Sequence, residues 1–210
     1  MEIELKYSIE DDSIIRNILE DQLLAGAGAG EVIAMHAVYF DTEQAELRKN
    51  HTAFRVRLEG GSYVATIKIG GSAVDGLHKR EELNAHVTDE EFIKNPDLSV
   101  FSGNKLVDDI ARRIGDNKLI PVMEMNFARE AVKIDYNGSI IEASIDQGDI
   151  ITANATCPIC ELELELYSGS ENDLIELGRQ LQQTYSLREE NTSKYARGLA
   201  LLAREPNAGS

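Results

Sequence analysis

The first seven residues, Met1-Glu2-Ile3-Glu4-Leu5-Lys6-Tyr7, decide the expected fold, because charged and apolar side chains alternate through them. Alternation with a period of two places the two kinds of side chain on opposite faces of a β-strand. Ordinarily the polar face of such a strand is exposed to water. Here we expect the charged face to line the inside of a barrel, because later stretches repeat the pattern with both signs of charge.

The later stretches keep the same strand phase. Their polar members are Arg55 and Arg57, Thr66 and Lys68, Arg80 and Glu82, Glu142 and Asp146, and Glu161, Glu163 and Glu165. A solvated sheet face is the alternative for any one strand. Stripes of both charges, on strands that can close on themselves, instead predict a polar interior that holds a polyanion and its metal ions.

The net charge and composition limit the classes of binding partner that we expect. A net charge of -16 over 210 residues repels nucleic acid and anionic membranes at long range, so neither is an expected partner. The 21 Lys and Arg residues suit a small, highly charged anion that is bound locally. No signal peptide or membrane-spanning run is visible, so the cytoplasm is the expected compartment. The sequence leaves open whether the protein is a monomer or a homodimer.

The predicted elements form one domain over residues 1–203, followed by a disordered tail at 204–210. Hairpin turns are expected at Gly60-Gly61 and Asn137-Gly138, and a flexible loop at 26–30. Strands are predicted at 1–7, 32–41, 52–59, 63–69, 79–87, 119–130, 131–136, 139–146 and 159–167. Helices are predicted over 12–24, after Thr88 or Asp89, and over 105–114, 170–185 and 193–202. The expected fold class is α+β, with an eight-stranded antiparallel barrel and flanking helices.

The motifs resemble the CYTH superfamily, also called triphosphate tunnel metalloenzymes. The opening Glu2-x-Glu4-x-Lys6 is similar to the family's E-x-E-x-K signature, and further motifs follow in the family's order along nearly the whole chain. These are Tyr39-Phe-Asp-Thr42, Arg55-Val-Arg57, Lys68, Arg80-Glu-Glu82, Arg129, Glu142-Ala-Ser-Ile-Asp146-Gln-Gly148, Glu161-Leu-Glu163-Leu-Glu165 and Ser193-Lys194-Tyr-Ala-Arg197-Gly198. The chain looks most like the bacterial inorganic triphosphatases of that superfamily.

The resemblance implies an eight-stranded tunnel that binds a triphosphate together with Mg²⁺ or Mn²⁺. Family members hydrolyse inorganic triphosphate or thiamine triphosphate, and a few make cyclic AMP from ATP. In some members a helical CHAD domain follows the tunnel, and we expect none within these 210 residues.

Acidic strand positions are the candidate metal ligands. Neighbouring strands lie about 4.8 Å apart, whereas alternate residues of one strand lie about 7 Å apart, so ligands are easier to gather across strands. Glu4 with Glu161 and Glu163 is therefore the preferred cluster. The complete candidate set is Glu2, Glu4, Glu142, Asp146, Glu161 and Glu163. Oxygen ligands without histidine favour Mg²⁺ or Mn²⁺ over zinc.

Basic strand positions are the candidate phosphate ligands, because Arg matches a phosphate with two hydrogen bonds and Lys supplies a point charge. The set comprises Lys6, Arg55, Arg57, Lys68, Arg80, Arg129, Lys194 and Arg197. Surface pairing with the acidic excess is the alternative. Lys194 and Arg197 share one helix face, which either faces solvent or lies near a tunnel mouth. Lys133 is expected outside the barrel, and His78 on a loop or strand surface.

The expected activity is metal-dependent hydrolysis of inorganic triphosphate to pyrophosphate and phosphate. The candidate catalytic residues are Glu2, Glu4, Lys6 and Asp146. Divalent ions would neutralise phosphate charge and activate water, and the cations would stabilise charge on the transferred phosphoryl group. Adenylyl cyclase of the class IV type and thiamine triphosphatase of the same fold are the enzyme alternatives. A polyphosphate-binding module without turnover is the alternative from another class.

Overall fold

The structure is a computed structural model that describes residues 1–24, 30–88 and 90–204. Its strands are β1 (Glu2–Ser8), β2 (Glu31–Asp41), β3 (Thr52–Glu59), β4 (Ser62–Val74), β5 (Leu77–Val87), β6 (Ile120–Tyr136), β7 (Ser139–Ile151), β8 (Thr156–Ser168) and β9 (Arg188–Glu189). Its α-helices are α1 (Ile15–Leu19), α2 (Glu46–Lys49), α3 (Glu91–Lys94), α4 (Lys105–Ile114), α5 (Glu171–Tyr185) and α6 (Lys194–Leu202). Short 3₁₀ helices cover Asp12–Ile14 and Leu98–Phe101.

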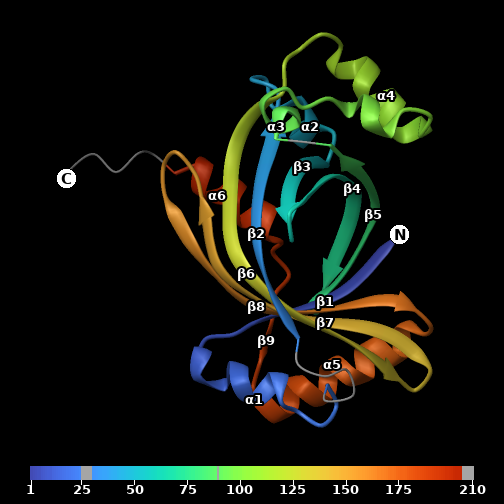
Figure 1. The fold of residues 1–210 in the computed structure, drawn as a ribbon, viewed down its shortest axis with the longest axis vertical. Helices are drawn as coiled ribbons and strands as arrows, with labels where there is room; N and C mark the ends of the chain where they lie inside the picture. The colour runs from blue at the N-terminus through green and yellow to red at the C-terminus, as the bar shows by residue number, and fades with distance from the viewer. Residues whose placement is uncertain (25–29, 89, 205–210) are drawn as a thin grey trace, which may run out of the picture.

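Eight strands close into an antiparallel barrel, which confirms the predicted fold class. The neighbours run in the order β5, β4, β3, β2, β6, β7, β8 and β1, and β1 pairs again with β5 to close the ring. The two-residue strand β9 adds to the end of β1. Figure 1 shows the long, strongly curved β6 running the length of the barrel, with helices at both ends.

The apolar core lies mainly outside the barrel, because the alternating strands turn their charged faces inward. Leu5 and Tyr7 of β1 point outward and pack with α5 through Leu174, Leu177 and Leu181. This layer, together with α1, lies beneath the barrel in Figure 1. The cluster holds sixteen buried residues, and their burial contributes most of the stabilisation of this half of the fold.

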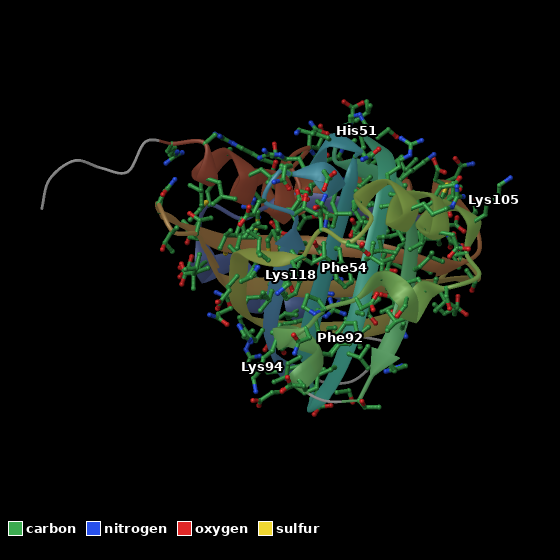
Figure 2. All side chains as sticks on the ribbon, turned by 90° about the horizontal axis from the view of Figure 1, so that it is seen from above. His51, Phe54, Phe92, Lys94, Lys105 and Lys118 are labelled. Atoms are coloured by element: carbon green, nitrogen blue, oxygen red, sulfur yellow. The ribbon has the colours of Figure 1, made fainter. Side chains whose placement is uncertain are left out.

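A second apolar layer covers the outer faces of β2, β3 and β4 at the opposite end of the molecule. Phe54 of β3 is fully buried, and Phe101 packs edge-on against its ring at a centroid distance of 6.3 Å. Phe92 of α3 and Ile110 of α4 belong to the same cluster. Figure 2 looks onto this end and shows Phe54 on its strand and Phe92 on α3.

The last helix packs against inward-facing apolar side chains and closes part of the barrel interior. Leu201 of α6 shares a buried cluster with Met35 of β2 and Met123 of β6. Gly198 allows this close approach, because a Cβ atom there would clash with the Met123 sulfur and lie 3.2 Å from Ile150 Cγ2. The first residue of α6, Lys194, is thereby brought inside the barrel.

The structure corrects several element boundaries. Residues 120–136 form one strand rather than two, because β7 pairs with it without a break from Glu124 to Tyr136, across the expected boundary. The helix expected over 12–24 ends at Leu19, because the Asp21 side chain accepts a hydrogen bond from Leu23 N and turns the chain. The loop expected at 26–30, except for Gly30, and the tail after Arg204 lie outside the described residues. None of the described helices is long and apolar enough to cross a membrane.

Candidate functional site: a charged barrel interior

A cavity of about 170 Å³ lies inside the barrel, and most of the residues that line it are charged. The strand register explains this lining. Glu2 faces Arg80, Lys6 faces Glu163, and Arg129 faces Asp146 across neighbouring strands. Opposite charges therefore meet directly around the inner wall, as cross-strand pairs do in favourable sheets.

Three carboxylates from β7 and β8 converge beside this cavity. Asp146 lies opposite Glu161 in the register, and Glu163 is two residues further along β8. One oxygen from each lies within 4.8 Å of the others. Asp146 is 0% exposed and Glu161 is 1% exposed. We call these three residues the carboxylate triad.

Each triad member is paired with a cation. Arg129 binds Asp146 with two hydrogen bonds, from Nε to Oδ1 at 2.7 Å and from Nη2 to Oδ2 at 2.6 Å. Lys194 Nζ lies 2.7 Å from Asp146 Oδ2 and 2.8 Å from Glu163 Oε1, and also contacts Glu161 Oε1. A buried carboxylate is tolerated only with such partners.

Arg197 completes the contact between α6 and the triad. Its Nη2 donates to Glu161 Oε2 at 2.5 Å. Lys194 and Arg197 therefore both point into the barrel. The sequence left their direction open, and the structure places them one turn apart on the inward side of α6.

A second charged group lies on β1, β4 and β5. Arg80 bridges the two glutamates of β1, with Nε 2.9 Å from Glu2 Oε2 and Nη2 2.5 Å from Glu4 Oε1. Lys68 Nζ lies 2.8 Å from Glu2 Oε1 and 2.6 Å from Glu82 Oε2. Lys6 joins this group to the triad, because it contacts both Glu4 and Glu163.

Two arginines of β3 face the cavity with unsatisfied donors. The Nε atoms of Arg55 and Arg57 are buried without a hydrogen-bond partner. Arg55 Nη1 donates to Tyr39 Oη at 3.4 Å, and Arg57 Nη2 donates to Glu59 Oε2 at 2.6 Å. These guanidinium groups can therefore take up an anionic ligand without losing all of their present contacts.

One mouth of the cavity carries a mixed group of side chains. Tyr167 is 52% exposed, and its hydroxyl donates to Glu142 Oε2 at 3.3 Å. Lys133 lies on the same face of β6 as Arg129, and its Nζ is 3.8 Å from the Tyr167 ring centroid. Lys133 is thus at the rim on the inner face, not on the outer face as predicted.

The charges of the interior shift its acid–base behaviour. Burial raises the pKa of Glu165, as do Glu2 and Glu4 nearby, to about 7. Burial acts in the same direction on Glu4, but Lys6 and other cations outweigh it and lower the pKa of Glu4 to about 2. For Tyr39 burial is outweighed by Arg55 and Lys68, so its pKa is lowered.

The fixed charges of the interior nearly cancel. Within the described part of the chain, nine carboxylates face eight cations, and Lys133 at the rim adds a further cation beside Glu142. The carboxylates are Glu2, Glu4, Glu59, Glu82, Glu142, Asp146, Glu161, Glu163 and Glu165, and the cations are Lys6, Arg55, Arg57, Lys68, Arg80, Arg129, Lys194 and Arg197. A polyanion alone would leave a large negative excess in this space, whereas a polyanion with divalent cations would not.

All candidate residues from the sequence lie in or beside the interior, although their grouping differs from the expectation. Asp146, rather than Glu4, shares the triad with Glu161 and Glu163. Glu142 lies at the mouth and is not a member of the triad.

Several lining residues were not among the candidates. Glu82 and Glu165 follow the same alternation as their neighbours, which was the available signal. Tyr39 and Tyr195, whose rings stack at 5.2 Å, gave no periodic signal. His78 was expected at the surface but is buried, because the segment before α6 covers it and Glu190 O lies 2.7 Å from its Nε2.

Known proteins share this architecture. A structure from Hippeastrum, provisionally named an adenylyl cyclase and described as having a dominant triphosphatase activity, superposes with a TM-score of 0.72. It is 18% identical, and the match covers 95% of this chain and 96% of that one. A provisionally named adenylate cyclase from Bacillus halodurans matches with a TM-score of 0.58 and 21% identity, covering 92% and 94% of the two chains. At these identities the likeness establishes the fold.

Sequence comparison adds a curated relative and a family. The inorganic triphosphatase of Haemophilus influenzae is 29% identical over 167 residues, which is 80% of this chain. That match spans 46% of the relative, so the chain corresponds to less than half of that protein. The family model described as the CYTH domain matches residues 1–199. The chain, with its closed eight-stranded barrel and charged interior, therefore belongs to the CYTH domain family.

Proposed function

We propose that the protein hydrolyses inorganic triphosphate to pyrophosphate and phosphate inside the barrel, with the help of divalent cations. The observation that carries this proposal is the lining of the cavity by alternating cations and carboxylates in strand register. A cavity of about 170 Å³ suits a small, fully charged ligand. We further propose that residues 1–203 act as one domain.

The cationic residues of the interior would bind the phosphate oxygens. Arg55 and Arg57 carry free Nε donors, and Lys6 of β1 and Arg129 of β6 line the same cavity. Guanidinium groups bind phosphate oxygens in pairs, and charge on the transferred phosphoryl group is stabilised by donors that are already in place. These residues would orient the triphosphate and neutralise most of its negative charge.

The carboxylates of the interior fit hard divalent cations. The triad offers three buried oxygens that lie within 4.8 Å of one another, and histidine is not part of it. Oxygen ligands of this kind favour Mg²⁺ or Mn²⁺. The residues that would hold the ions are Asp146, Glu161 and Glu163, with Glu2 and Glu4 on the adjoining wall. Such ions supply charge neutralisation and a more acidic water molecule.

Carboxylate side chains of the protein can accept the proton of the attacking water. Glu2 and Glu4 both line the cavity, so either carboxylate can accept a proton from water beside the terminal phosphate. The two cysteines, Cys157 and Cys160, lie on β8 away from the cavity lining. We therefore propose direct attack by water without a covalent intermediate on cysteine.

The test is turnover of inorganic triphosphate in the presence of Mg²⁺ or Mn²⁺. The release of phosphate is measured over time. Thiamine triphosphate and ATP serve as competing substrates, and cyclic AMP is measured in the same reactions. Preferred turnover of inorganic triphosphate supports the proposal. Formation of cyclic AMP, faster hydrolysis of thiamine triphosphate, or tight binding without turnover would each contradict it.

A further inference from the structure

Lys194 separates the cavity from two of the three triad carboxylates. Its side chain lines the cavity together with Glu163, whereas Asp146 and Glu161 do not reach the lining. Both of those carboxylates are almost completely buried. An ion that enters through the cavity therefore meets the Lys194 ammonium before it meets the full triad.

The contacts of Lys194 also resemble those of a bound cation. Its Nζ contacts one oxygen from each triad member, and the outer oxygens are held by Arg129 and Arg197. Two of the inner oxygens have a second partner, because Arg129 also contacts Asp146 Oδ2 and Lys6 also contacts Glu163 Oε1. The ammonium thus stands where the three inner oxygens converge. A divalent ion that used these oxygens would take the same position.

We propose that Lys194 is the internal counter-ion of the carboxylate triad and that it couples metal binding to substrate binding. This inference rests on the proposed function. When a divalent ion takes the triad, the Lys194 ammonium loses its three anionic partners and needs another. A triphosphate in the adjoining cavity supplies phosphate oxygens as that partner. Ion and substrate therefore each favour the binding of the other.

The helix that carries Lys194 is fixed, so the exchange requires movement of the side chain alone. Ser193 caps α6 by accepting a hydrogen bond from Ala196 N at 3.2 Å. Before it, Glu190 N donates to Lys6 O and Gly76 N donates to Asn191 Oδ1, both at 2.9 Å. Arg197 remains on Glu161 Oε2, which the triad's inner face does not use.

Binding of Mn²⁺ in the absence of any phosphate compound tests the inference. Lys194→Met removes the ammonium and keeps the length of the side chain. We expect Mn²⁺ to bind this variant about tenfold more tightly than the wild type, measured by calorimetry and by electron paramagnetic resonance of free Mn²⁺. Lys133→Met removes a cation from the cavity rim without touching the triad, and its Mn²⁺ affinity should match the wild type.

The coupling itself gives a second expected result. A non-hydrolysable imidotriphosphate should tighten Mn²⁺ binding to the wild type, and Lys194→Met should lose about tenfold of that enhancement. If Lys194→Met does not fold, Lys194→Gln provides a neutral side chain that still donates a hydrogen bond to the triad. Mn²⁺ affinity that is unchanged or weaker in a folded neutral variant would overturn the inference.

The outcome is distinguishable from failure of the proposed function. Tighter Mn²⁺ binding in the variant, with no hydrolysis of triphosphate by the wild type, would support the role of Lys194 and contradict the hydrolase. Hydrolysis of triphosphate by the wild type, with no change of Mn²⁺ affinity in the variant, would support the hydrolase and contradict the role of Lys194.

Discussion

Lys6 of β1 and Glu163 of β8 lie opposite each other in the barrel wall and form a buried ion pair. Glu163 also contacts Arg129 and Lys194, so three cations surround one carboxylate. Burial raises the pKa of Glu163, but these cations outweigh it and hold the pKa well below its ordinary value. The pair joins the β1 glutamates to the carboxylate triad. A change of charge at Lys6 or Glu163 therefore alters the electrostatic environment of both groups.

Neutralising either Glu4 or Glu163 should remove metal-dependent turnover. We expect Glu4→Gln and Glu163→Gln each to lower kcat for triphosphate by at least about 100-fold, because an electrostatic group of the site is lost. Circular dichroism should show the folded state for both variants. Glu20→Gln, at an exposed position directly after α1, is the matched control and should keep full activity. Near-normal turnover in both variants would contradict a role of Glu4 and Glu163 in catalysis.

Removing the Arg57 guanidinium should weaken triphosphate binding. Arg57→Ala deletes a donor that lines the cavity and has a free Nε, so we expect the Kd for imidotriphosphate to rise about tenfold or more. Calorimetry measures this directly. Arg112→Ala, on the exposed surface of α4, should leave the Kd unchanged. An unchanged Kd for Arg57→Ala would place the bound anion elsewhere.

Truncation of the core outside the barrel should separate stability from activity. Leu177 of α5 is completely buried against the outer face of the barrel. Leu177→Ala should cost about 2–5 kcal/mol of unfolding free energy and leave KM unchanged. Leu106→Ala, at a position 51% exposed, should change stability by less than about 0.5 kcal/mol. A raised KM for Leu177→Ala in the folded protein would show that this layer also shapes the cavity.

Glu165 should make the stability of the metal-free protein depend on pH. Its pKa is about 7 when folded and 4.5 ordinarily, so the folded protein keeps a proton there that the unfolded chain releases. The free energy of unfolding therefore falls as pH rises from 4.5 to about 7. Glu165→Gln removes this loss and should be more stable than the wild type by about 2 kcal/mol at pH 8.

At about pH 3 the variant and the wild type should be nearly equally stable, because this pH lies well below the ordinary pKa of 4.5 and the carboxyl group is protonated in both states. Urea unfolding in the presence of a chelator measures the difference at each pH. A difference between variant and wild type that stays constant across this range would show that Glu165 keeps an ordinary pKa.

Much of the barrel could be predicted from the sequence, because its signal is local. Alternation at Glu2, Glu4 and Lys6 assigns each side chain to one face, and the turns at Gly60-Gly61 and Asn137-Gly138 set the order of two hairpins. The continuity of β6 was missed, because it depends on pairing with β2 and β7, which no local pattern records.

The grouping of the charges could not be predicted, because it depends on the stagger between strands. Asp146 faces Glu161, and Glu4 faces Glu165, which keeps Glu4 out of the triad. The inward direction of Lys194 follows from the packing of Gly198 on Met123 and Ile150, a contact between distant parts of the chain. The burial of His78 likewise depends on a contact between distant parts of the chain, because the segment at Glu190 covers its side chain.

The most direct test of the central claim is the initial rate of phosphate release from inorganic triphosphate with saturating Mg²⁺ or Mn²⁺. Thiamine triphosphate and ATP are assayed in parallel under the same conditions. The account predicts rapid release from inorganic triphosphate, at least about tenfold slower release from the other two compounds, and no turnover after chelation of the metal. Absence of phosphate release from inorganic triphosphate in the presence of either metal would contradict it.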